Sequence, residues 1–253
     1  MLKKSLNKSS NPFFAGNRIA AAQTANADYS QAAESQEVMT VQGAVNKSIM
    51  LGVLLVATAL VSFNFPNPLL IWGGLIGGLI LVFVAVFKPQ HSGKIAPAYA
   101  VLQGLVVGGI SALYGAMYDG IIFQAISLTM AVFFIMLFIY KTGIIKVTQK
   151  FRAGVVMATG AILVVYVINF VMNLFGSGLP YLHEGGTVGI LISLVIVGVA
   201  ALNLLLDFDN FDKGEEAKAP IHMEWFAAMG LIITLVWLYL EILRLLAMLY
   251  GRD

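Results

Sequence analysis

Residues Leu69-Leu-Ile-Trp-Gly-Gly-Leu-Ile-Gly-Gly-Leu-Ile-Leu-Val-Phe-Val-Ala-Val-Phe87 run without a single charged side chain. A helix of about 20 predominantly apolar residues crosses a bilayer, so this stretch predicts a transmembrane helix. Six further stretches have similar length and character: Ala44–Phe63, Ala96–Met117, Ile121–Tyr140, Ala153–Phe175, Val188–Leu206 and Trp225–Leu249. The sequence therefore predicts an all-α, polytopic membrane protein built as a seven-helix bundle.

Composition supports a membrane protein and leaves little room for a soluble domain. Of the 253 residues, 59% are hydrophobic and only 11% are charged. A soluble domain of this size needs more polar surface. Residues 1–43 are rich in Ala, Ser, Asn and Gln and show no sustained apolar period, which predicts a disordered cytoplasmic tail before a membrane domain at 44–250.

Basic residues fall almost entirely on one side of the predicted membrane. The three connections around Asn64–Pro68, Tyr118–Gly120 and Gly176–Thr187 contain no Lys or Arg. All but two of the 15 Lys and Arg residues lie on the other side, in the tail, at the start of the first stretch or in the other connections: Lys3, Lys4, Lys8, Arg18, Lys47, Lys88, Lys94, Lys141, Lys146, Lys150, Arg152, Lys213 and Lys218. The positive-inside rule therefore predicts a cytoplasmic N-terminus and a C-terminus outside.

Motifs of soluble enzymes are missing. The chain has no cysteine, no nucleophile elbow, no HExxH and no Walker loop. We expect no enzymatic activity and no bound cofactor. The basic inner rim suits anionic lipid headgroups rather than nucleic acid, so the expected partner is the bilayer.

The sixth apolar stretch ends in an acidic run, Asp207-Phe-Asp-Asn-Phe-Asp212. Asp207 follows the apolar residues directly, and Asn203 lies one helical turn earlier on the same face. A carboxylate at this depth must face the bundle, find a partner or hold a proton. The alternative is that Asp207 marks the emergence of the helix into water, with Asp209 and Asp212 as solvated turn residues. The run lacks the spacing of an EF-hand, and Asp207 and Asp209 are the candidate calcium ligands.

The last apolar stretch contains a Glu and an Arg three residues apart, Glu241 and Arg244. This spacing places both side chains on one face, where they can form a structural ion pair, with Arg244 extending toward the outer interface. Glu224 is expected to complement the dipole at the start of this helix. The remaining embedded polar side chains are expected to make contacts between helices, or else to line a wet path: Asn203, Asn169, Asn173 and Gln103.

Three segments in the last two stretches resemble the transmembrane Bax inhibitor motif family, in its long-tailed, YccA-like bacterial branch. They are Leu206-Asp-Phe-Asp209, Glu224-Trp-Phe-Ala-Ala228 and Leu235-Val-Trp-Leu-Tyr-Leu-Glu-Ile-Leu-Arg-Leu-Leu246. The resemblance covers roughly residues 40–250. It implies a bacterial inner-membrane protein in which six helices wrap a central, hydrophobic seventh. It also implies a pH-sensitive calcium leak gated by two aspartates, one on each of the last two helices.

The resemblance carries the first of these aspartates onto Asp207 and places Thr234 at the position of the second. A threonine cannot share a proton as a carboxyl group does. Either Glu241 or Asp209 substitutes from a neighbouring position, or this branch lacks the pair. The basic partner of the aspartates would fall near Lys88 to Lys94.

Two functions follow from these features. The first is a proton-modulated cation leak, with calcium as the expected ion and Asp207, Asp209, Thr234 and Glu241 as candidate gate or proton-sensing residues. The alternative is a non-transporting stress regulator that binds membrane proteases or other membrane proteins. A water-accessible path to Asp207 would favour the leak.

The predicted topology can be tested with single cysteines, because the native chain has none. A cysteine at Ser177 is expected to react with an impermeant reagent from outside the cell, and a cysteine in Lys141–Arg152 only from the cytoplasm. Preferential labelling at Ser177 from the cytoplasmic side contradicts the topology.

Overall fold

The computed structural model describes residues 38–176 and 186–251. The predicted tail therefore lies outside the described residues up to position 37. The elements are α2 (Val41–Asn64), α3 (Pro68–Phe87), the 3₁₀ turn η1 (Pro89–His91), α4 (Ser92–Met117), α5 (Ile121–Thr142), α6 (Gln149–Leu174), α8 (Thr187–Glu216) and α9 (His222–Tyr250). Seven of these helices are long and apolar enough to cross a membrane, which confirms the predicted fold class.

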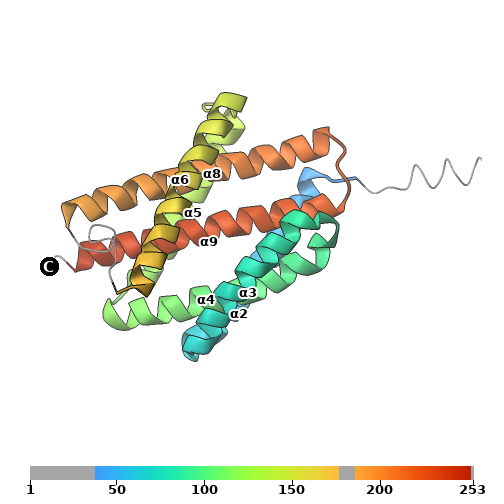
Figure 1. The fold of residues 1–253 in the computed structure, drawn as a ribbon. Coiled ribbons are helices and arrows are strands. Elements are labelled where there is room, and N and C mark those ends of the chain that lie inside the picture. Colours follow the sequence, from blue (N-terminus) through green and yellow to red (C-terminus); the bar gives the residue numbers. More distant parts are fainter. Residues whose placement is uncertain (1–37, 177–185, 252–253) are drawn as a thin grey trace, which may run out of the picture. The chain divides into compact units, whose positions relative to one another are not determined.

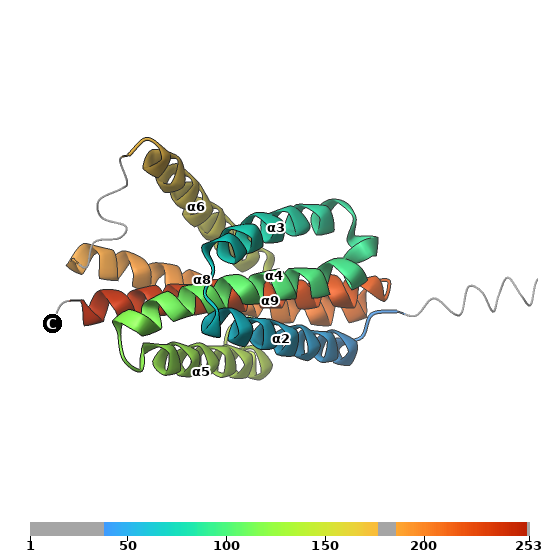
Figure 2. The ribbon, with the colours of Figure 1, turned by 90° about the horizontal axis from the view of Figure 1, so that it is seen from below.

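The last helix is the centre of the bundle. In the most apolar window of α9, 61% of residues are buried, against at most 39% in any other spanning helix. Helix α9 packs against α2, α4, α5 and α8, and Figures 1 and 2 show it running between α4 and α8. Helix α9 is central, as expected, while α3 packs mainly on α4 and α6 mainly on α8.

Helix starts follow local capping chemistry. The Thr40 side chain accepts a hydrogen bond from the Gly43 amide at the start of α2. Asn67 caps α3 in the same way ahead of Pro68, whose missing N–H costs nothing at the first helical position. Thr148 caps α6. Pro97 lies inside the first turns of α4.

Helix α8 differs most from its predicted extent. It was expected to end at Leu206 but continues to Glu216. The interpretation of Asp209 and Asp212 as solvated turn residues is therefore wrong: both are helical, and Asp209 is buried. The extension occurs because each of these acids has a partner on a neighbouring element, as described below.

Two contacts between elements show which connections lie at the same end of the bundle. The rings of Tyr118 and Tyr250 lie 5.7 Å apart and join the α4–α5 turn to the end of α9. At the other end, the amide of Met39 donates to the carbonyl of Ala219 at 2.7 Å, next to the α8–α9 connection. This second end carries the described basic connections, and we call it the basic end.

Glycines determine how closely α2 and α4 approach. A Cβ at Gly108 would overlap the backbone of Ala59, and one at Gly104 would overlap Thr58. Buried Ser62 donates to the carbonyl of Leu105 at 2.7 Å across the same interface. Small residues at i and i+4 allow this contact, as the sequence pattern predicts.

Gly108→Ala is expected to lower the thermal stability of the detergent-solubilised protein, with a cost of about 1–3 kcal/mol from overpacking against Ala59. Gly73→Ala is the matched control, because nothing lies within 4 Å of a Cβ at Gly73. An equal effect of the two substitutions would contradict a backbone-contact role for Gly108.

Candidate functional site

Asp207 lies on the seam between α8 and α9. A Cβ added at Gly230 of α9 would lie 3.7 Å from Asp207 Oδ1, an ordinary van der Waals distance, so the carboxyl group packs against α9 at Gly230. The Asp207 oxygen Oδ2 is buried and has no hydrogen-bond partner among residues 38–176 and 186–251. A buried polar atom without a partner is rare, because desolvation is not offset by a new bond.

Thr234 is the second member of this seam. Its side chain interacts with the carboxyl group of Asp207, and its hydroxyl lies 3.3 Å from the carbonyl oxygen of Gly230. A hydroxyl has one proton to donate, so Thr234 can serve either the Gly230 carbonyl or Asp207. The residue at the position of the family's second aspartate thus does face Asp207, as a hydroxyl rather than as a carboxyl group.

Arg152 of α6 interacts electrostatically with Asp207. A basic partner near Lys88 to Lys94 stays a prediction. The guanidinium of Arg152 also binds Asp209 Oδ2 at 2.5 Å and donates to Asn210 at 2.9 Å. Sequence reasoning counted Arg152 only as a loop base, and no spacing rule could place it against α8.

Asp209 is ion-paired with two cations. Its Oδ2 atom pairs with Arg152 and, at 2.6 Å, with Lys213 one turn later on α8. A calcium ion at Asp207 and Asp209 would have to compete with both cations for that carboxylate. Across the described ranges, no three His, Asp or Glu side chains gather closely enough to hold a metal ion.

Asp212 connects α8 to α5. The hydroxyl of Tyr140 donates to Asp212 Oδ2 at 2.6 Å. With Asp209 held by Arg152 of α6, the acids of the extended α8 tie three helices together at the basic end. The sequence carried no sign of the Tyr140 contact, because the two residues are far apart in the chain.

Glu241 and Arg244 form an ion pair of 2.7 Å. Glu241 is buried and also accepts a hydrogen bond from the hydroxyl of Tyr166 on α6. The Arg244 guanidinium lies 5.5 Å from the centre of the Tyr166 ring. The Arg244 side chain is 15% exposed, so it packs against neighbouring side chains, and its extension toward the outer interface stays a prediction.

The remaining predicted polar residues lie at separate helix contacts. Asn203 donates to Thr159 of α6 at 2.7 Å and to the carbonyl of Val199. Asn173 donates to the backbone of buried Asn169 at 2.8 Å. The amide oxygen of Gln103 lies 3.1 Å from where a Cβ at Gly78 would stand. None of these contacts joins the Asp207 seam, so the site consists of Asp207, Thr234, Gly230 and Arg152.

The Glu241–Arg244 ion pair is expected to stabilise the folded protein. Arg244→Leu leaves the buried Glu241 carboxylate with Tyr166 as its remaining partner. Removing one member of a buried ion pair lowers the free energy of unfolding by about 3–5 kcal/mol. The double change Arg244→Leu with Glu241→Leu is expected to lower the melting temperature in detergent less than Arg244→Leu alone. A double variant that loses the sum of the two single losses would show that the pair is uncoupled.

Comparison with known protein families identifies the family of this chain. None of the curated proteins matches this sequence. The model of the family described as Bax inhibitor 1 like matches residues 11–251, which include every spanning helix and the Asp207 seam. The chain therefore belongs to the Bax inhibitor 1-like family.

Proposed function

We propose that this protein is a pH-sensitive cation leak of the bacterial inner membrane, with its N-terminus in the cytoplasm, calcium as the leading ion and Asp207 as the titrating gate. The single observation that carries the proposal is the buried, partnerless Oδ2 atom of Asp207 between α8 and α9. An ionisable group inside a membrane bundle is costly to maintain and is usually tied to ion or proton movement.

The gate works through the two protonation states of Asp207. When Asp207 is protonated, its O–H group can donate a hydrogen bond to the Thr234 hydroxyl. The Thr234 hydroxyl then donates to the Gly230 carbonyl, and the seam stays closed. When Asp207 is ionised, one hydroxyl cannot satisfy a carboxylate with several acceptor sites. Water or a cation then supplies the missing partners, and α8 separates from α9.

The charged neighbours favour a gate at the basic end. Arg152 interacts electrostatically with Asp207, but its guanidinium is bound by Asp209 and Asn210. The ionised Asp207 therefore keeps an unsatisfied negative charge that attracts a cation entering from this end. Because rising pH ionises Asp207, the cation flux is expected to increase with pH.

The test is calcium flux from purified protein in liposomes between about pH 6 and pH 8, a range in which buried carboxyl groups can titrate. Flux through the wild type is expected to rise with pH, and Asp207→Asn is expected to flatten the profile. Glu216→Gln is the matched control, since Glu216 is an exposed acid on the same helix. Asp212 is unsuitable as the control because it binds Tyr140.

Identical pH profiles for the wild type and Asp207→Asn would remove Asp207 from the mechanism. A folded wild-type protein with no flux at any pH would favour the alternative function, a non-transporting regulator that binds membrane proteases or other membrane proteins.

A further inference from the structure

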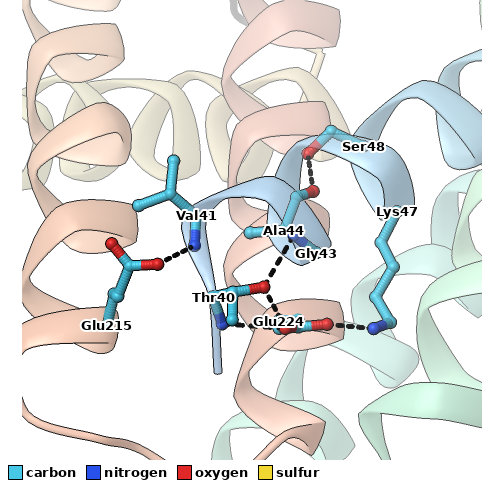
Figure 3. Close-up of polar contacts among 8 residues, drawn as sticks. All are labelled: Thr40, Val41, Gly43, Ala44, Lys47, Ser48, Glu215 and Glu224. Carbon is cyan, nitrogen blue, oxygen red and sulfur yellow. Dashed lines mark hydrogen bonds and ion pairs between the residues drawn. The ribbon is translucent and has the colours of Figure 1, made fainter. Parts of the chain in front are cut away.

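The first residues of α2 contact both helices of the Asp207 seam at the basic end (Figure 3). The amide of Val41 donates to Glu215 Oε1 of α8 at 3.1 Å. The amide and hydroxyl of Thr40 both donate to Glu224 Oε1 of α9, at 2.8 and 3.1 Å. Lys47 pairs with the other oxygen of Glu224. We call these contacts of Thr40, Val41 and Lys47 with Glu215 and Glu224 the staple.

Glu224 is far more enclosed than a helix-dipole role requires. Only 3% of its surface is exposed, although it lies in the first turn of α9. Lys47, its counter-ion, also lies over the ring of Trp225 at 5.4 Å. Hydrogen bonds to a charged group are worth more than neutral ones, and a buried carboxylate with three donors is strongly fixed in place.

Glycines at two positions let the chain approach this closely. A Cβ at Gly43 would overlap the carboxylate of Glu224, so any larger residue must displace it. On the α8 side, a Cβ at Gly214 would overlap the sulfur of Met39, which is 2% exposed. Both glycines sit at the points where the start of α2 meets the other two helices.

The staple acts on the same helix segments that carry the seam. Glu215 follows Asp207 by eight residues on α8, about 12 Å along the axis, and Glu224 precedes Gly230 by six residues on α9, about 9 Å. Because each segment is one continuous helix, fixing these ends sets the separation of α8 and α9 at Asp207.

We propose that Glu224 is a positioning residue for the gate, holding α9 through Thr40 and Lys47 while Glu215 holds α8 through Val41, so that the staple keeps the seam closed. This inference rests on the proposed leak function. Releasing the staple leaves Asp207 and Thr234 chemically intact but lets the helix ends separate without ionisation of Asp207.

The experiment compares Glu224→Gln and Gly43→Ala with the wild type in the liposome assay, at the pH where wild-type flux is lowest. Glu224→Gln removes the charge that binds Lys47, while Gly43→Ala displaces the carboxylate without changing any charge. Each is expected to raise flux about tenfold, the shift that losing roughly one charged hydrogen bond makes in a two-state equilibrium. Glu224→Asp keeps the charge and acceptors and is expected to restore low flux.

Two controls match the chemistry of these changes. Glu216→Gln removes an exposed acid at the same end, and Gly198→Ala adds a Cβ where nothing lies within 4 Å. Neither is expected to change flux. Nitroxide labels at Asn46→Cys and Ile221→Cys report the distance between α2 and the start of α9, which is expected to lengthen and broaden in both staple variants.

The outcomes separate this inference from the proposed function. Longer label distances with unchanged flux would overturn the positioning role while leaving the pH dependence set by Asp207 in place. Unchanged label distances in both variants would also overturn it, because the staple would then not hold the helix ends. If Glu224→Gln fails to fold, Gly43→Ala decides between these outcomes. Absent flux in the wild type overturns both proposals.

Discussion

Every polar group inside this bundle needs a partner from the protein, because the hydrocarbon around it supplies none. The constraint is most severe along α9, the most buried helix, which carries Glu224, Thr234 and Glu241. Glu224 accepts hydrogen bonds from Thr40 and is ion-paired with Lys47. Glu241 is ion-paired with Arg244 and accepts a hydrogen bond from Tyr166. The carboxyl group opposite Thr234 retains a buried oxygen, Asp207 Oδ2, without a hydrogen-bond partner in the described part of the chain. Ser193 Oγ and Glu241 Oε2 are in the same position, but Glu241 Oε2 is ion-paired with Arg244. Acids with an ion-pair partner stabilise the bundle, and Asp207 is the acid at which a change of protonation can alter it.

The packing around α9 is uneven, and this decides where movement is easy. Helices α2 and α4 meet through glycines with backbone in direct contact, and α3 adds to that side by packing on α4. On the other side, α6 contacts mainly α8, through side-chain pairs such as Arg152 with Asp209 and Asn203 with Thr159. Close-packed backbone resists displacement, whereas side-chain pairs can exchange partners. The Asp207 seam lies between these two sides.

The sequence was a good guide to whatever depends on hydrophobic length and local spacing. All seven spans were predicted, and the three-residue spacing placed Glu241 beside Arg244. The length of α8 was underestimated because eight of its last ten residues are polar or glycine, and their helical state depends on Tyr140, Arg152 and the start of α2. Glu224 was assigned to the helix dipole because its partners, Thr40 and Lys47, precede it by more than 170 residues. Contacts of this kind follow from the tertiary fold and have no local signature.

The helices differ widely in length, and this makes the protein responsive to the thickness of its membrane. Helix α3 has 20 residues and spans about 30 Å, which only just matches a typical hydrocarbon core, whereas α8 has 30 residues and spans about 45 Å. A thinner bilayer must be met by tilting α8 further or by exposing more of its charged end to headgroups, while α3 needs little adjustment. The tilt of α8 relative to its neighbours is therefore partly a property of the lipid, and lipid composition enters the energetics of the protein without any lipid occupying a binding site.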